Sequence, residues 1–425
     1  MTTIKPFKAV VYNPEKTPDL SSLICPPYDI ISPSRQEYYH KLNPYNFIQI
    51  LLGKDIPGED KYIRAADYFK RWQEEKIFIQ DERPAIYFYS QQYTIRGEKK
   101  IRLGFMALLR LEEKNPTVFG HERTHSQPKE DRLKLLKSTK ANLCPIFVIF
   151  LDKKRIIPRI FQQYLPGQKP FIDMVDDEKI THKLWRIDSA DILDKIQTQM
   201  QSENIFIADG HHRYEVACIY REQMKRTLGT IIQEEDFNYI LTYFTNIDPH
   251  SLSILPVHRL LKLNSRIDMG NLLSCLKEYF DIEEVKDKIR FFFLMEKAGM
   301  HEHVLGMYKD ARFWLLRLKN VKILDKVMQD KPPEFRALDV SILNFLILNK
   351  LLGPDSQEGI VVFSHNAEEI MSEADNHPCS LAFLLNPLKV SQITAVALSG
   401  EKMPPKSTYF YPKVPSGLLI NKHQD

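Results

Sequence analysis

Cysteine is scarce in this sequence, and the few copies lie far apart. The 425 residues include five cysteines, and no two of them form a Cys-x-x-Cys pair. An odd number of scattered cysteines argues against a disulfide framework and against a zinc ribbon built on paired thiolates. The length predicts two or three domains, and the 43% of hydrophobic residues is enough for a sizeable apolar core.

Long apolar runs and a strong net charge are also missing. No stretch approaches the roughly 20 apolar residues of a membrane-spanning helix, and residues 1–8 lack the apolar segment of a signal peptide. The formal net charge is only +4 and is spread along the chain, whereas nucleic-acid binders carry a basic stripe or tail. We therefore expect a cytoplasmic protein that binds neither membranes nor nucleic acids. The composition does not determine an oligomeric state.

The most informative polar cluster follows a short apolar stretch. Residues 205–208 are apolar and β-prone, which predicts a buried strand. The apolar stretch is followed by one glycine and four polar or charged residues, which are Asp209, Gly210, His211, His212 and Arg213. Gly210 supplies a permissive backbone, and the apolar spacing after it predicts a helix from His211. The first amides of a helix favour an anion, above all a phosphate, and Arg213 adds a forked donor suited to its oxygens. Asp209 is placed to hold a cation or to orient a histidine.

A second polar cluster contains a literal His-Glu-x-x-His, which begins at His121. Zinc peptidases need both histidines on one face of a helix and a third ligand downstream. Gly120 and Pro128 disfavour a long helix through this motif, and no downstream continuation follows, so we reject that interpretation. Without zinc, Glu122 fits the base that accepts a proton from an acceptor hydroxyl. The cationic groups expected around a transferring phosphoryl group are His121, Lys129 and Arg132.

Two proline-rich segments remain ambiguous on physical grounds. Prolines 26 and 27 hold the backbone extended and present Tyr28 and Asp29 in a fixed direction. This segment is either an active-site loop or a turn before the helix predicted to begin near residues 32–33. Residues 404–408, Pro-Pro-Lys-Ser-Thr, either close over a phosphate with one charge and two hydroxyls or form a proline-stiffened strand.

The chain pattern predicts an α/β domain followed by an α+β domain. Helical and strand patterns alternate through residues 1–262, where residues 85–93 and 100–111 predict a β-hairpin. The character changes after residue 262, and residues 263–425 are expected to form the second domain. In it we expect meander strands at 290–295, 303–308 and 313–318. Residues 402–413 are expected to return to the cleft of the first domain.

Taken together, these segments resemble the signature of the domain-of-unknown-function ten-fifteen family of bacteria and archaea. The matching segments are Pro-Pro-Tyr-Asp at 26–29, the polar cluster at 121–132, Asp-Gly-His-His-Arg at 209–213 and Pro-Pro-Lys-Ser-Thr at 404–408. His125 replaces an aliphatic residue of the family pattern, and Cys144 stands where the family tends to a small residue. More distantly, the family resembles the partition-protein-B and sulfiredoxin superfamily, which includes free serine kinases.

The resemblance implies a phosphotransferase on a partition-protein-B/sulfiredoxin-like mixed sheet. Its expected reaction converts L-serine and pyrophosphate to O-phosphoserine and phosphate, with Mg²⁺ as cofactor. An ATP- or ADP-dependent small-molecule kinase or nucleotide-binding switch is the first alternative, although the chain has no Walker motif and no kinase glycine-rich loop. A non-catalytic DNA-binding partition-type protein is the second, and the weak net charge argues against it.

The resemblance also assigns expected roles to residues. Catalysis is assigned to Glu122, Asp209 and His211, and Asp209 is also the expected metal ligand. Phosphate binding is assigned to Gly210, His211, His212, Arg213, Lys129, Arg132, Lys406, Ser407 and Thr408. Substrate binding is assigned to Tyr28, Asp29, His121, Thr124 and Asn142.

Overall fold

The computed structural model describes residues 1–111, 117–123, 126–228, 235–248, 250–352 and 360–424. The chain forms two compact units. Unit 1 consists of Met1–Gly120, Thr124–Ser253 and Pro412–Asp425, and unit 2 consists of His121–Arg123 and Ile254–Tyr411. Residue 262, where the sequence pattern changes, is the last residue of a strand in unit 2, and the C-terminal residues return to unit 1.

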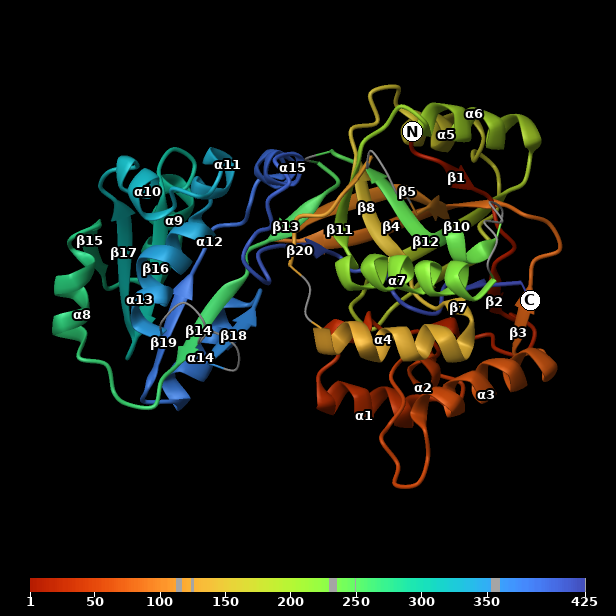
Figure 1. Cartoon of the computed structure of the whole chain (residues 1–425), viewed down its shortest axis with the longest axis horizontal. Helices are drawn as coiled ribbons and strands as arrows, with labels where there is room; N and C mark the ends of the chain where they lie inside the picture. The colour runs from red at the N-terminus through yellow and green to blue at the C-terminus, as the bar shows by residue number, and fades with distance from the viewer. Residues whose placement is uncertain (112–116, 124–125, 229–234, 249, 353–359, 425) are drawn as a thin grey trace. The chain divides into compact units, whose positions relative to one another are not determined.

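Unit 1 is built on a nine-stranded mixed sheet (Figure 1). Its strands, in spatial order, are β6 (Val118–Phe119), β11 (Ile205–Asp209), β8 (Ile146–Phe150), β12 (Tyr239–Asn246), β5 (Glu98–Arg110), β4 (Ile86–Ile95), β10 (Thr181–Ile187) and β9 (Ile172–Val175), with β1 (Ile4–Lys5) paired to β5. The β8–β12 and β6–β11 pairs are parallel, and the other pairs are antiparallel. Every residue of β8 is buried, which explains its uninterrupted apolar sequence.

Helices cover this sheet on both sides. The helices of unit 1 are α1 (Pro33–Leu42), α2 (Ile48–Leu51), α3 (Lys61–Glu74), α4 (Ser126–Thr139), α5 (Ile156–Gln163), α6 (Ala190–Met200) and α7 (His211–Leu228), with 3₁₀ turns η1 (Leu20–Ser22), η2 (Tyr28–Ile30) and η3 (Asp236–Asn238). Helices α5 and α6 pack on the sheet near β1, whereas α7 lies beside α4, which contacts α3 (Figure 1). Asp60 caps α3 by accepting from the amides of Tyr62 and Ile63.

Two small strand pairs complete unit 1. They are β2 (Val10–Tyr12) with β3 (Phe78–Gln80), and β7 (Ala141–Asn142) with β21 (Asn421–Lys422). The β7–β21 pair joins the C-terminal segment to the strand that precedes β8. The expected hairpin of residues 85–93 and 100–111 is confirmed as β4 and β5, and the short strand before Asp209 is confirmed as β11.

Unit 2 contains a six-stranded antiparallel sheet with helices packed against it. The strand order is β15 (Phe280–Val285), β17 (Arg312–Leu318), β16 (Val304–Lys309), β19 (Ser380–Leu384), β14 (His258–Lys262) and β18 (Val361–Ser364). A separate pair joins β13 (Ser253–Leu255) to β20 (Tyr409–Tyr411). The helices are α8 (Met269–Leu276), α9 (Lys288–Ala298), α10 (Lys322–Val327), α11 (Pro333–Arg336), α12 (Asp339–Leu343), η4 (Asn344–Leu348), α13 (Asn349–Leu352), α14 (Ala367–Asn376) and α15 (Val390–Leu398).

One expected strand of unit 2 is wrong. Residues 290–295 belong to α9, whose N-terminus is capped by the Asp287 carboxylate accepting from the Arg290 amide. Phe291 and Met295, one turn apart, are buried, whereas Phe293 is 58% exposed, so this apolar run has a helical and not an alternating burial pattern. Among the helices of the described residues, none combines the length and the apolar composition needed to cross a membrane.

Candidate functional site

The junction between β11 and α7 has the predicted form. The strand ends at Asp209, and the helix begins at His211. Gly210 joins them with φ +90°, a value that side-chain-bearing residues rarely adopt. A Cβ atom at this position would lie 3.0 Å from Cγ2 of Ile146, so glycine is also required for space. His211 is buried and His212 is partly buried at the first turn of α7.

The carboxylate of Asp209 is paired with two cations of unit 1. Its Oδ2 accepts from the Arg213 guanidinium at 2.5 Å, and its Oδ1 accepts from the Lys413 ammonium. Burial acts to raise the pKa of Asp209, but Lys413 and Arg213 together hold that pKa well below its usual range. Arg213 also donates to the carbonyl of Pro145. Arg213 is therefore anchored on two sides and does not extend freely into solvent.

Four of the predicted site residues line one pocket in unit 1. They are Tyr28, Arg132, Asn142 and Arg213, and they come from four separate segments of the chain. The cavity measures about 60 Å³, several times the roughly 10–15 Å³ that a single water needs. Both arginines that line it are paired with carboxylates, Arg132 with Asp131 and Arg213 with Asp209, and most of the other lining residues are apolar.

Arg132 and Tyr28 form one side of this pocket. Arg132 is buried, donates to the Leu51 carbonyl at 2.8 Å and to the Asp131 carboxylate at 2.8 Å, and lies over the Tyr28 ring at 4.3 Å. Tyr28 and Asp29 lie in the turn η2, directly after Pro27. Burial and the neighbouring Asp29 raise the pKa of Tyr28, so its hydroxyl stays protonated and can donate to an anion.

Asn142 and a further predicted residue of unit 1, Lys129, have structural partners. The side-chain oxygen of Asn142 accepts from the Leu241 amide and from Asn421, both at 3.1 Å, and so joins β7 to β12 and β21. Lys129 pairs with Glu215 at 3.1 Å and links α4 to α7. Thr124, predicted to bind substrate, lies outside the described residues, as does His125.

The remaining predicted residues are brought together in unit 2. His121 Nε2 lies 3.1 Å from the Thr408 hydroxyl, and Glu122 Oε1 accepts from the Lys406 amide at 3.1 Å. The Ser407 hydroxyl donates to the Pro404 carbonyl at 2.5 Å. Glu122 also forms an isolated β-bridge with Met403, so it is extended and does not have the helical geometry of a zinc peptidase.

A metal could bind Asp209 only if the hydrogen-bond partners of this carboxylate changed. Each oxygen of its carboxylate already accepts from a cationic side chain. Within the described part of the chain, no three His, Cys, Asp or Glu side chains are grouped as metal ligands. The residues as they stand do not fit a bound Mg²⁺, and magnesium stays a prediction.

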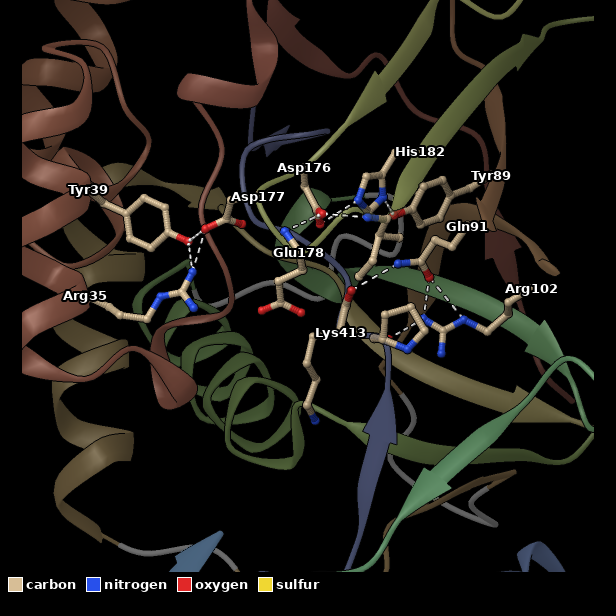
Figure 2. Close-up of polar contacts among 12 residues, drawn as sticks. Arg35, Tyr39, Tyr89, Gln91, Arg102, Asp176, Asp177, Glu178, His182 and Lys413 are labelled. Atoms are coloured by element: carbon tan, nitrogen blue, oxygen red, sulfur yellow. Dashed lines mark hydrogen bonds and ion pairs between the residues drawn. The ribbon is translucent and has the colours of Figure 1, made fainter. Parts of the chain in front are cut away.

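Lys413 is a site residue that sequence reasoning missed, although it ends the segment 402–413. Figure 2 shows its carbonyl accepting from Gln91, at 3.0 Å, while Gln91 in turn accepts from Arg102. Arg102 also donates to the Pro412 carbonyl, and both Gln91 and Arg102 are fully buried. These two strand residues fix the backbone from which Lys413 reaches Asp209. The sequence signal for Lys413 is a lysine directly after a proline, and this pattern also occurs at many surface positions.

Hydrogen bonds link three polar side chains on and beside strands β4 and β10. The Tyr89 hydroxyl lies 2.6 Å from His182 Nδ1, and His182 Nε2 lies 2.9 Å from the Asp176 carboxylate (Figure 2). The next residue, Asp177, accepts from Arg35 at 2.6 Å and from Tyr39 at 2.9 Å. These contacts connect the turn between β9 and β10 to strand β4 and helix α1.

Comparisons with known proteins place the chain in a family. It is similar to a free serine kinase variant in complex with ADP at 10% identity (75% of this chain, 93% of that chain, TM-score 0.35). It is also similar to C-terminally truncated SbnI from Staphylococcus aureus at 12% identity (74% of this chain, 87% of that chain, TM-score 0.37). A third similar structure is a conserved hypothetical protein from Pyrococcus furiosus at 12% identity (72% of this chain, 92% of that chain, TM-score 0.32). A search of curated proteins found no match. The family model "Protein of unknown function (DUF1015)" matches residues 4–341, and the chain therefore belongs to the DUF1015 family.

Proposed function

We propose that this protein transfers a phosphoryl group from pyrophosphate to the hydroxyl of L-serine. The bond between the bridging oxygen and one phosphorus of pyrophosphate breaks, and a bond from the serine oxygen to that phosphorus forms. The products are O-phosphoserine and phosphate, and the hydroxyl proton passes to a base. The proposed fold relationship is to the partition-protein-B/sulfiredoxin superfamily, on the sequence resemblance of the four polar segments.

One observation supports the proposal best: the pocket of unit 1 is lined by both Arg132 and Arg213. Paired guanidinium groups suit the oxygens of a phosphate, and the Tyr28 hydroxyl adds a neutral donor. The sequence contains no Walker motif and no kinase glycine-rich loop, which supports pyrophosphate over ATP or ADP as the donor.

The residues of unit 1 would act mainly by binding and electrostatic stabilisation. Arg132 and Arg213 would hold the oxygens of the donor, with the amides at the start of α7 contributing the positive end of the helix dipole. Asp209 would keep Arg213 and Lys413 in place, because both cations donate to its carboxylate.

The proposed base is Glu122 of unit 2. Its Oε1 accepts from the Lys406 amide, which orients the carboxylate that we propose as the proton acceptor. Lys406, Ser407 and Thr408 remain proposed phosphate-binding residues, and His121 remains a proposed substrate-binding residue.

A thermal-shift experiment tests the proposal against its alternatives. The full chain would be heated with pyrophosphate, ATP, ADP, L-serine or a DNA duplex, each with and without magnesium. A ligand that binds only the folded chain raises the melting temperature by mass action. We expect the largest increase with pyrophosphate. A larger increase with ATP or ADP would favour the nucleotide-dependent alternative, and an increase with DNA alone would contradict the phosphotransferase.

A further inference from the structure

Strand β9 forms an open edge of the large sheet of unit 1. It ends the strand order, and among the described strands it pairs with β10 alone. The Asp176 amide donates to the Ile180 carbonyl at 3.0 Å, and this bond sets the alternation of the antiparallel ladder. In that alternation Asp173 and Val175 direct their amides and carbonyls away from β10. Within the described part of the chain, no hydrogen bond reaches these outward groups.

A cavity of about 580 Å³ lies along this open edge. All four residues of β9, Ile172–Val175, line it. Successive side chains of a strand point to opposite faces of the sheet, so a cavity that borders all four lies against the edge and not on one face. The other lining residues come from β2, β3, β10, residues 14 and 17–21, Phe171 and Leu418, all of them in unit 1. The volume is within the range of about 300–1,000 Å³ that is typical of ligand sites.

Much of the cavity lining is apolar and held in place. Tyr12 and Leu418 are buried residues of this lining. Arg186 lies over the Phe171 ring at 4.7 Å, and its guanidinium donates to Asp81 through Nε at 2.7 Å and through Nη2 at 2.5 Å. A strand that adds to an open edge presents alternate side chains to each face of the sheet, and apolar surfaces of this kind suit apolar side chains.

Asp19 gives the cavity a negative charge that the chain does not neutralise. Its Oδ1 accepts from the Ser21 amide at 3.2 Å and from the Ser21 hydroxyl at 2.5 Å. No cation of the described residues lies within ion-pair distance of it. The other charged lining residues, Arg186 and Asp173, are each paired with an opposite charge of the chain. The cavity is therefore complementary to a ligand that carries a positive charge.

We propose that the open edge of β9 binds an extended peptide segment of a partner protein, with apolar side chains at alternate positions and a lysine or arginine opposite Asp19. The main chain of the peptide pairs with the outward amides and carbonyls of Asp173 and Val175. Two copies of β9 are a poorer match, because Asp173 and residues 176–178, Asp-Asp-Glu, would place like charges opposite one another. The inference does not rest on the proposed function, since β9 and β11 lie towards opposite ends of the strand order.

Fluorescence anisotropy of a labelled seven-residue peptide tests this surface. The peptide alternates valine and threonine between two terminal lysines and is titrated with the full chain. We expect saturable binding to the wild type and a loss of affinity of about tenfold in Val175→Pro, because proline removes an outward amide that β10 does not use. Val175→Thr keeps this amide and a β-branched side chain, so it should bind the peptide as the wild type does.

Asp19→Asn tests the charge separately. Asparagine keeps a side-chain oxygen that accepts from Ser21 but carries no charge. Affinity for the lysine peptide should fall about twofold to fivefold, the usual contribution of an exposed ion pair. Affinity for the same peptide with glutamine in place of lysine should stay unchanged. An equal fall for both peptides would contradict a cationic partner.

Methylated peptides keep the inference testable if Val175→Pro does not fold. N-methyl groups on one alternate set of peptide amides should abolish binding to the wild type, and on the other set they should not, because one set alone faces β9. Equal effects of both methylation patterns would overturn the inference, as would equal affinities of the wild type and a folded Val175→Pro, or no binding at millimolar peptide. Self-association of the wild type that Val175→Pro abolishes, measured by sedimentation equilibrium, would assign the edge to a second copy of the chain instead.

Discussion

At the scale of single residues, Asp209 joins two cations from distant parts of the chain. Lys413 and Arg213 both donate to its buried carboxylate. Removal of Asp209 or of Lys413 therefore leaves a buried charge on the remaining partner that is not fully compensated. We expect Asp209→Asn and Lys413→Met each to lower the free energy of unfolding by a few kcal/mol. In a double-mutant cycle measured by urea denaturation, their effects should be non-additive by about 1–3 kcal/mol. Additive effects would mean that the contact contributes nothing to stability.

Glu122 gives a second residue-scale prediction. Because its Oε1 accepts from the Lys406 amide, glutamine preserves that hydrogen bond and removes only the basic oxygen. Glu122→Gln should therefore lower turnover about 10²- to 10⁴-fold, the usual contribution of a positioned base, with little change in donor affinity or melting temperature. Glu122→Ala, which also loses the hydrogen bond, should be less stable than Glu122→Gln. A fully active Glu122→Gln would place the base elsewhere, with Asp29 as the next candidate.

At the scale of elements, the strand-to-helix turn at Gly210 depends on glycine for two reasons. Its φ is +90°, and an added Cβ would lie 3.0 Å from Ile146. Gly97, in the turn between β4 and β5, has a similar φ of +80° with nothing within 4 Å, so Gly97→Ala measures backbone strain alone. We expect Gly97→Ala to cost about 1 kcal/mol and Gly210→Ala to cost more, measured by chemical denaturation. Equal losses would show that Ile146 gives way without cost.

Strand β14 predicts a pH dependence of stability through His258. Burial, together with the nearby Arg259 and His365, lowers the pKa of His258 to about 4 in the folded state, and its Nδ1 atom accepts from the Leu385 amide. The unfolded chain, with a value near 6.5, binds more protons between these two pH values. The free energy of unfolding should therefore fall as the pH drops from about 6.5 to about 4, by roughly 1–3 kcal/mol.

The matched variant for this prediction is His258→Asn. Asparagine keeps an acceptor near the Nδ1 position but does not titrate. The difference in unfolding free energy between wild type and variant should shrink steadily from pH 6.5 to pH 4. A difference that stays constant over this range would contradict the assignment.

The elements also show what the sequence could predict. Asp209, Gly210 and the apolar spacing after them marked the end of β11 and the start of α7, because a glycine and a change of periodicity are local signals. The run from Arg290 to Met295 carries no such periodicity, because nearly every residue is apolar, and an apolar run of this length equally predicts a strand. Its helical state depends on the Asp287 cap and on which residues the sheet buries.

At the scale of the whole molecule, the predicted site residues fall into two groups. Tyr28, Arg132, Asn142 and Arg213 line the pocket of unit 1, whereas His121 and Glu122 contact residues 406–408 in unit 2. The segments themselves were recognisable, because polar residues concentrate there beside prolines and glycines. Which of these segments contact one another could not be predicted, because tertiary contacts determine the partner of a charged side chain. Lys413 illustrates this, since Gln91 and Arg102, from distant parts of the sequence, hold the backbone at Lys413 and Pro412.

The measurement that tests the account most directly is phosphorus NMR of the reaction itself. The full chain would be mixed with L-serine, magnesium and one donor at a time: pyrophosphate, ATP or ADP at equal concentration. The account predicts an O-phosphoserine signal that grows fastest with pyrophosphate. It also predicts that the Glu122→Gln variant produces this signal at least about a hundredfold more slowly. Faster product formation from ATP or ADP would overturn the assigned donor, and no O-phosphoserine from any of the three would contradict the phosphotransferase.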